Sequence, residues 1–330
     1  MKKKSILLFI IASIQIYAFA QAFDTSGSFV RDTSFSVSGT FVKESKVRPF
    51  IKVAQEEITK DIEFLDSVVY SVPYEGRKLH LKIFKPKAQG KYPALLIVHG
   101  GGWSSGDFTM ELPMAIRIAK QGFVTMTVEH RLSPEMPYPA AVNDLKTAVR
   151  WVRANSAFLN VDPNAIAISG CSAGGQLAGL IGATNDQEEY ECKKEYPNFS
   201  SSVQAVINID GISDFTVQSA ADAAQADYDK GKLSASVRWL GGTYKQSPEN
   251  WEAASAIYHV TKDSAPICFI NSSIARFHDG RDEIIKKLDT YNIYTEVHSF
   301  DDTPHPFWLF DPWFVPTTDY MIAFMNKMFK

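Results

Sequence analysis

The chain has 330 residues, of which 45% are hydrophobic and 22% are charged, and its formal net charge is −3. This length allows one large α/β domain or two small ones, and nothing in the composition indicates a nucleic-acid-binding protein. Three cysteines are present, and the sequence shows no metal-ligand spacing, so we expect no metal and no cofactor.

The first residues have the pattern of a secretory signal peptide. Three lysines follow Met1, an apolar run extends from Ile6 to Ala20, and small residues suited to cleavage end at Ala20 and Ala22. We therefore expect residues 1–22 to be removed, which leaves a net charge of −6, and the mature protein to be secreted or periplasmic. A membrane anchor is the alternative, but the run is short for a span. No other stretch approaches that length, so we expect no membrane span after removal of the signal.

The rest of the chain divides into an N-terminal extension, residues 23–66, and one domain, residues 67–330. The extension is rich in Ser, Thr and Gly, and Ser28 to Val42 could pair as strands. In the domain, apolar runs typical of strands alternate with helical spacing, which predicts a parallel sheet covered on both faces. Its active site would lie beyond the carboxyl ends of the strands. The predicted elements are a hairpin (68–84), strands (94–98, 123–128, 166–169, 203–209, 266–270, 296–300), helices (110–121, 141–158, 173 onward, 282–291, 320–328) and an irregular segment (210–261).

The stretch from Gly170 to Gly174 has the form G-x-S-x-G and joins a predicted strand to a predicted helix. In a nucleophile elbow of this form, the glycines let the strand and the helix approach closely while the serine takes a strained backbone conformation. That geometry exposes the Ser172 hydroxyl at the end of the strand. It also leaves the N–H of Ala173 free to meet an anion. An ordinary strand-to-helix turn can have the same sequence, so the motif needs support from elsewhere.

A second glycine motif provides that support. His99 to Trp103, HGGGW, follows the predicted strand at 94–98. Acyl transfer requires donors at the point where the carbonyl oxygen becomes an oxyanion, and consecutive glycines can turn their N–H groups inward without interference from side chains. The loop therefore predicts the second half of an oxyanion hole, in which His99 holds the loop in shape.

From Ala94 to about Gly182 the chain resembles the α/β-hydrolase esterases of the hormone-sensitive-lipase type and the related feruloyl and acetylxylan esterases. The motifs occur in the family's order: HGGGW (99–103), EHRLSPE (129–135), PAA (139–141), GCSAGG (170–175) and the terminal histidine loop HPFW (305–308). The resemblance implies an α/β-hydrolase fold, with a mostly parallel central sheet and helices on both faces. It also implies these roles: Ser172 as the nucleophile, His305 as the base, and Gly101, Gly102 and Ala173 as the oxyanion donors.

The third member of the expected triad, a carboxylate that orients the base, is missing from its usual place. Counted back from His305, the family's acid falls near Ala275, where the sequence has no carboxylate. Asp282 is favoured instead, because the loop before it is long enough to fold back toward His305, although Asp282 also has the position of a helix N-cap. The alternatives that the sequence leaves open are Asp302, Asp279, Asp210 and Asp214.

The resemblance and the export signal together predict a secreted serine esterase that removes short acyl groups, acetyl first, from a plant cell-wall polysaccharide such as xylan or pectin. Its partner would be an acylated polysaccharide or oligosaccharide, and the sequence predicts no oligomeric state. A lipid or general carboxylesterase is one alternative, which would need an apolar acyl tunnel. A glycan-binding homologue impaired in catalysis is another, because the usual acid is missing.

Overall fold

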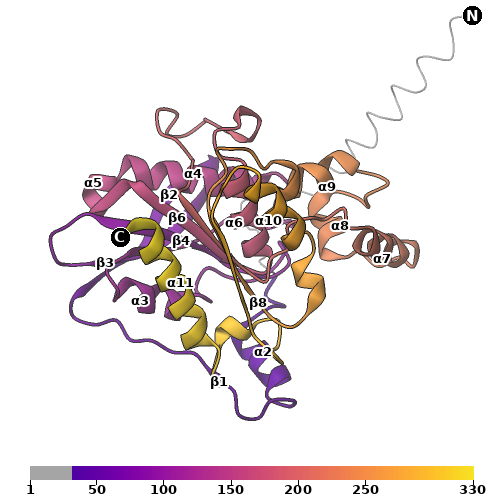
Figure 1. Ribbon diagram of the computed structural model, residues 1–330, viewed down its shortest axis with the longest axis horizontal. Helices are drawn as coiled ribbons and strands as arrows, with labels where there is room; N and C mark the ends of the chain where they lie inside the picture. Colours follow the sequence, from indigo (N-terminus) through magenta and orange to yellow (C-terminus); the bar gives the residue numbers. More distant parts are fainter. Residues whose placement is uncertain (1–31) are drawn as a thin grey trace, which may run out of the picture.

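The computed structural model describes residues 32–330, so the expected signal peptide, residues 1–22, lies outside the described residues. An eight-stranded sheet with helices on both faces forms the predicted α/β-hydrolase fold (Figure 1). The strand order is β2-β3-β5-β4-β6-β7-β8-β9; β2–β3 and β3–β5 are antiparallel, and the other pairs are parallel. The strands are β2 (Ile62–Tyr74), β3 (Arg77–Pro86), β4 (Tyr92–Val98), β5 (Val124–Val128), β6 (Val161–Cys171), β7 (Ala205–Ile209), β8 (Ile267–Asn271) and β9 (Thr295–Ser299).

The central strands are apolar on both faces because helices cover both sides of the sheet. On β4, Leu96 belongs to a core that also contains Leu145 and Leu177. The neighbouring side chain, Leu95, points the other way and belongs to a second core, which contains Met321. The sheet therefore separates two apolar layers, and the ends of its strands are where polar side chains can gather.

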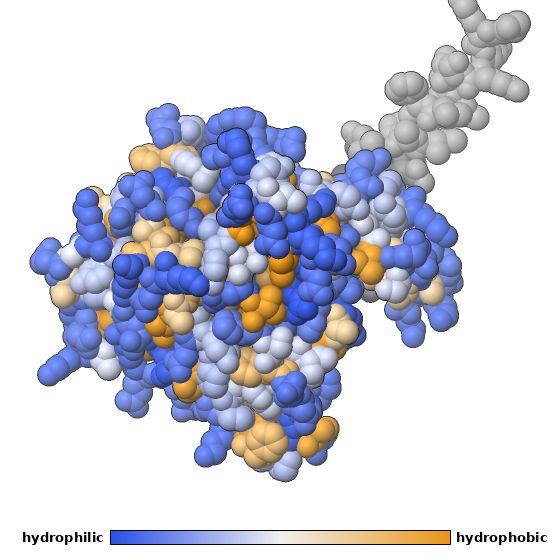
Figure 2. Space-filling model, viewed as in Figure 1, coloured by the Kyte–Doolittle hydropathy of each residue, from blue (hydrophilic) through white to orange (hydrophobic). Residues whose placement is uncertain are grey.

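The two layers are filled by helices that pack on opposite faces of the sheet. α4, α6 and α10 contribute side chains to the core that contains Leu96, whereas α3 and α11 contribute to the core that contains Leu95. No helix among residues 32–330 is long and apolar enough to cross a membrane, and the face drawn in Figure 2 is mainly hydrophilic with scattered apolar side chains. These helices are α3 (Leu112–Ala119), α4 (Ala140–Ala154), α6 (Ala173–Ala183), α10 (Arg281–Asp289) and α11 (Phe314–Phe329), and a short α5 (Ser156–Leu159) follows α4.

Between β7 and β8 the chain forms three helices beside the carboxyl ends of the strands: α7 (Gln218–Asp229), α8 (Ala235–Leu240) and α9 (Pro248–Ala254) (Figure 1). Trp239 of α8 and Trp251 of α9 anchor this group in the core, since each is only 1% exposed. α7 lies at the edge of the molecule and buries only two side chains, both alanines. The segment that was predicted to be irregular is therefore largely helical, and it borders the site described below.

The N-terminal part differs from the sequence-based prediction. The strands that Ser28 to Val42 could have formed are absent from its described residues, where α2 (Val37–Glu44) begins after Ser36, whose hydroxyl accepts the N–H of Gly39. This N-cap favours a helix over a strand at that point. The domain boundary expected between residues 66 and 67 falls inside β2. Between α2 and β2, the short β1 (Lys52–Val53) pairs with β10 (Phe310–Asp311) near the C-terminus.

Candidate active site

Ser172 occupies the sharp turn between β6 and α6. Its backbone has φ 54° and ψ −119°, which is a strained conformation for a residue with a side chain. The turn is fixed on both sides. Its N–H donates to the carbonyl of Ile209 at 2.7 Å, and a Cβ on Gly174 would lie 2.2 Å from the carbonyl oxygen of Val98. Strand and helix therefore hold the serine at the carboxyl edge of the sheet, as the G-x-S-x-G motif predicted.

The HGGGW loop lies against this turn. A Cβ on Gly100 would be 3.2 Å from the Cβ of Ser172, and Gly101 has a φ of 122° that only glycine adopts readily. The Gly101 carbonyl accepts hydrogen bonds from the Ser105 N–H and hydroxyl, which closes the loop. Within residues 32–330, the N–H groups of Gly101, Gly102 and Ala173 donate to no acceptor. They are therefore available to an oxygen anion beside Ser172.

His305 lies in the loop between β9 and a short 3₁₀ helix, η4 (Phe307–Leu309), and its ring contacts the side chains that directly follow β6 and β7. Its Nε2 is 2.7 Å from the Oγ of Ser172, and its Nδ1 is 2.9 Å from Oδ2 of Asp210. An ionised carboxylate can only accept, so Nδ1 carries the proton and Nε2 accepts from the serine hydroxyl. The three side chains form one chain of hydrogen bonds in the geometry of a Ser-His-Asp triad.

Asp210 is fully buried at the end of β7. Its other oxygen, Oδ1, accepts the N–H of Ser272 at 2.7 Å and lies 3.4 Å from the amide nitrogen of Asn271. Both donors come from the end of β8. A buried carboxylate is tolerated when such donors surround it, so the neighbouring strand holds Asp210 in place.

The favoured contact between Asp282 and His305 was wrong. Asp282 lies in the first turn of α10, where its side chain is 64% exposed and accepts from Nε of Arg281 at 2.8 Å. A helix N-terminus and an adjacent cation already stabilise that carboxylate in solvent, so nothing draws it inward. The loop before it does not fold back; it forms a 3₁₀ helix, η3 (Ala275–His278), above the site.

Apart from Asp210, none of the candidate carboxylates is hydrogen-bonded to His305 within residues 32–330. Asp302 is 91% exposed and pairs with Arg48 at 2.9 Å, and Asp214 accepts from the backbone and hydroxyl of Thr216. Asp279 is half-buried; burial and the charge of Asp214 raise its pKa. The sequence did carry a signal for Asp210: it directly follows a buried strand, as Ser172 does, and the carboxyl ends of parallel strands meet at one edge.

Two side chains that the sequence did not single out complete the surroundings of His305. The ring of Phe277, from η3, stacks on the imidazole with centroids 3.4 Å apart and planes 8° apart. Burial lowers the pKa of His305, the charge of Arg276 lowers it further, and Asp210 opposes both. His305 is therefore neutral at neutral pH, which is the state that a general base needs.

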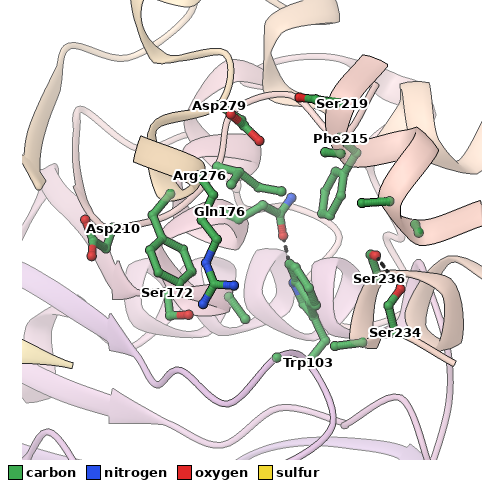
Figure 3. A pocket seen from close by; sticks show the side chains of 18 of the residues that line it. Trp103, Ser172, Gln176, Asp210, Phe215, Ser219, Ser234, Ser236, Arg276 and Asp279 are labelled. Carbon is green, nitrogen blue, oxygen red and sulfur yellow. Dashed lines mark hydrogen bonds between the residues drawn. The ribbon is translucent and has the colours of Figure 1, made fainter. Parts of the chain in front are cut away.

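A cavity of about 710 Å³ opens beside Ser172 (Figure 3). Its wall nearest the glycine loop is aromatic: Trp103 stacks on Trp239 at 4.9 Å, and its indole N–H donates to Gln176 at 2.9 Å. Residues from α7, α8 and η3 line the rest of the cavity. The cavity is large enough for a sugar-sized group and has both apolar and polar surfaces.

His99, which was expected to hold the glycine loop in shape, contacts the backbone of that loop. The rings of His99 and His130 stack with centroids 4.6 Å apart, and Nδ1 of His99 is 2.7 Å from the carbonyl oxygen of Gly100. Arg131 binds Asp144 through two nitrogens, with a closest approach of 2.6 Å. His99 therefore faces the loop backbone rather than Ser172.

In the described part of the chain, one group of residues has metal-ligand geometry: Cys268, Glu296 and His298, on β8 and β9. Burial raises the pKa of the Cys268 thiol, which disfavours the thiolate that a metal would need. None of these three residues lines the cavity beside Ser172.

Residues 81–287 match the BD-FAE family over more than half of the chain. The chain belongs to the BD-FAE family. The resemblance to α/β-hydrolase esterases that the glycine motifs indicated is thereby confirmed. The BD-FAE match includes both glycine motifs, Ser172 and Asp210, and it ends before His305.

Two curated relatives of this BD-FAE chain come from Mycobacterium tuberculosis. Esterase LipC is 35% identical over 184 residues, which are 55% of this chain and 44% of LipC. Carboxylesterase NlhH is 40% identical over 115 residues, which are 34% of this chain and 36% of NlhH. The matched segment is thus less than half the length of each relative.

Two solved structures share the fold of the BD-FAE chain. One is a truncated carbohydrate esterase from gut microbiota, with a TM-score of 0.65 and 22% identity, covering 84% of this chain and 100% of that one. The other is the esterase Est2 of Thermogutta terrifontis with butyrate bound, with a TM-score of 0.66 and 23% identity, covering 82% of this chain and 95% of that one.

Proposed function

We propose that this protein is a serine ester hydrolase in which Ser172 is the nucleophile, His305 the general base and Asp210 the orienting acid. The observation that supports it is the continuous chain of hydrogen bonds through these three side chains, at 2.7 and 2.9 Å, beside three free N–H groups. Nucleophile, base and orienting group within hydrogen-bond reach of one another are the signature of an activated serine.

In the proposed reaction, Oγ of Ser172 attacks the ester carbonyl carbon while Nε2 of His305 takes the hydroxyl proton. The carbonyl oxygen becomes an oxyanion, which the N–H groups of Gly101, Gly102 and Ala173 stabilise. The C–O bond to the alcohol then breaks, and His305 gives its proton to the departing alkoxide. Water repeats the attack on the acyl-enzyme and releases the acid. Throughout, Asp210 keeps the proton on Nδ1 and stabilises the imidazolium.

The substrate class is part of the proposal: short acyl esters, acetyl first, on a plant cell-wall polysaccharide such as xylan or pectin. The aromatic and polar walls of the cavity suit a sugar ring, and one solved structure of the same fold is that of a carbohydrate esterase. The signal-peptide pattern of residues 1–22 supports secretion or export to the periplasm, where such a polymer would be met.

A general carboxylesterase is the second candidate, because one of the relatives is named a carboxylesterase. The two candidates differ in their acyl preference. Hydrolysis of acetyl and octanoyl 4-nitrophenyl esters should favour acetate if the polysaccharide assignment is right, whereas a preference for octanoate would favour the carboxylesterase.

The test of the chemistry is Ser172→Ala, with Ser38→Ala, at an exposed serine of α2, as the matched control. Ser172→Ala should lower the turnover of 4-nitrophenyl acetate and of acetylated xylan by about 10⁴-fold or more and abolish labelling by a fluorophosphonate. Ser38→Ala should change neither. Undiminished turnover or labelling in folded Ser172→Ala protein would refute the assignment of Ser172. Absence of labelling in the natural protein would favour the glycan-binding alternative, because an unactivated serine does not react with the probe.

A further inference from the structure

Arg276 brings a positive charge into the site from the loop between β8 and α10. It lies on η3 and lines the same cavity as Ser172. Figure 3 shows its side chain extending into the cavity, with the guanidinium directed toward Ser172. Its charge is close enough to His305 to lower the pKa of that ring.

The guanidinium of Arg276 forms no hydrogen bond and no ion pair with any other residue of the described segment 32–330. Its recorded contact is with the ring of Phe277, 4.7 Å from the ring centroid. A guanidinium carries five N–H donors in a fixed fork, which matches the two oxygens of a carboxylate. In this site, the fork is unused.

The segment that carries Arg276, η3, is held in place by contacts of the neighbouring residues. Phe277 stacks on His305, and Nε2 of His278 donates to the carbonyl of Ser272 at 2.8 Å. The N–H of Ile274 donates to the hydroxyl of Ser272. These contacts fix η3 on both sides of Arg276, so its charge is directed into the cavity by the fold.

The carboxylates that share the cavity do not neutralise this charge. Asp210 is buried and is engaged by His305, Ser272 and Asn271. Asp279 points elsewhere in Figure 3, and Asp227 belongs to α7 on another wall. An anionic group on the substrate would therefore find one free, preorganised partner near the reacting carbonyl.

We propose that Arg276 recognises a carboxylate carried by the ester substrate, so that the site prefers acidic esters over their neutral counterparts. This inference rests on the proposed function of Ser172. The carboxylate can come from either side of the ester bond: from an acidic sugar that carries the acetyl group, as in an acetylated uronic acid, or from the acyl group, as in the half-ester of a dicarboxylic acid. The shared chemistry is a carboxylate bound bidentately by the guanidinium.

The test compares two matched pairs of esters, one for each source of the carboxylate. The first pair is the acetylated methyl glycosides of glucuronic acid and glucose, which differ at C6. The second is 4-nitrophenyl hydrogen adipate and 4-nitrophenyl hexanoate. For each pair, the ratio of kcat/KM, acidic over neutral, is measured in the natural protein, Arg276→Gln and Arg276→Lys. Lys43→Gln, at an exposed cation remote from the cavity, is the control.

We expect the acidic ester of one pair to be preferred, and that pair identifies the source of the carboxylate. Arg276→Gln should lower the ratio of that pair roughly tenfold, Arg276→Lys should lower it less, and Lys43→Gln should leave it unchanged. Raising the salt from about 0.05 M to about 0.5 M should weaken the preference, since the guanidinium is exposed.

Two results would overturn the inference, and they are distinguishable. If the neutral esters are hydrolysed but neither ratio changes in Arg276→Gln, Arg276 has no role in specificity and only covers Phe277, while the proposed function stands. If none of the four esters is hydrolysed by the natural protein, the proposed function fails, and the inference fails with it.

Discussion

β7 and β8 are neighbours in the sheet and end at the same edge, but their ends carry opposite chemistry. β7 ends at a carboxylate, Asp210, whereas β8 ends at Asn271 and Ser272, whose amide and backbone N–H donate to that carboxylate. One strand thus supplies the acid for His305, and its neighbour supplies the groups that hold the acid. The position of the acid therefore depends on two adjacent strand ends, the one that carries it and the one that donates to it.

The difference has a second effect, on the loop that follows β8. Because that loop does not have to deliver the acid, η3 can lie over the site, with Phe277 on the imidazole and Arg276 in the cavity. Since the acid follows β7, the loop after β8 is available for contacts with a substrate.

The largest expected effect on kcat comes from replacing the acid at the end of β7. Asp210→Asn should lower kcat by about 10³- to 10⁴-fold, because the imidazole loses the anion that fixes its tautomer and stabilises its charged form. Asp282→Asn, a matched change at an exposed carboxylate, should change kcat less than about twofold. Steady-state kinetics on 4-nitrophenyl acetate measures both. A large loss of kcat in Asp282→Asn, with little change in Asp210→Asn, would mean that Asp282, after β8, is the acid.

Another buried carboxyl, Glu111, sharpens the comparison with Asp210, because burial outweighs the hydrogen-bond donors near it. Burial raises its pKa to about 8, nearby Asp107 adds to the rise, and Trp308 opposes it. The ordinary pKa is 4.5, so between these values the folded protein holds a proton that the unfolded chain releases. The stability of the folded protein therefore falls as the pH rises through this range, by up to about 5 kcal/mol.

Glu111→Gln should remove this dependence. Raising the pH from about 5 to about 9 should lower the Tm of the natural protein more than that of the variant, as measured by thermal unfolding. Equal losses of Tm in the two proteins would show that the carboxyl is ionised or paired in the folded state.

On the β8 side, Asn271→Leu removes the amide that faces Asp210 and keeps a similar volume. The same amide accepts from Arg281 at 3.0 Å, so the change loosens both the acid and the loop. We expect kcat/KM to fall about tenfold, since the Ser272 N–H still holds Asp210. Asn198→Leu, at an exposed position, is the control. A loss as large as that of Asp210→Asn would mean that the donor matters as much as the acid.

The smallest effect is on the pH profile. Burial and the charge of Arg276 hold the pKa of His305 below its usual 6.5, and the base acts only when neutral. kcat/KM should therefore rise with pH through a midpoint below 6.5. Arg276→Gln should move that midpoint upward, and Lys43→Gln should not. A midpoint that is insensitive to Arg276 would mean that its charge is screened from the imidazole.

The parts of the site that the sequence predicted are those that local geometry forces. Gly174 must be glycine because a Cβ would meet the Val98 carbonyl oxygen at 2.2 Å, and Gly101 because of its positive φ. Such constraints leave a visible motif around Ser172, whereas the role of His305 was implied by the resemblance of its HPFW loop to the family. The structure brings these two residues together. Asp210 left only a positional signal, its place after a buried strand, and several other carboxylates competed with it until their surroundings in space were known. Asp282 was favoured on loop length alone, which does not determine the path of a loop.

α7 should tolerate mutations better than the strand ends that hold Ser172 and Asp210. It forms a wall of the cavity, yet only Ala221 and Ala224 fix it to the core. The strand ends that hold Ser172 and Asp210 are, in contrast, locked between two fully packed layers. Mutations, insertions or a grafted segment in α7 therefore disturb little of the folding energy while they reshape what the cavity admits. The same scaffold can diversify into enzymes of different selectivity without altering its reacting groups.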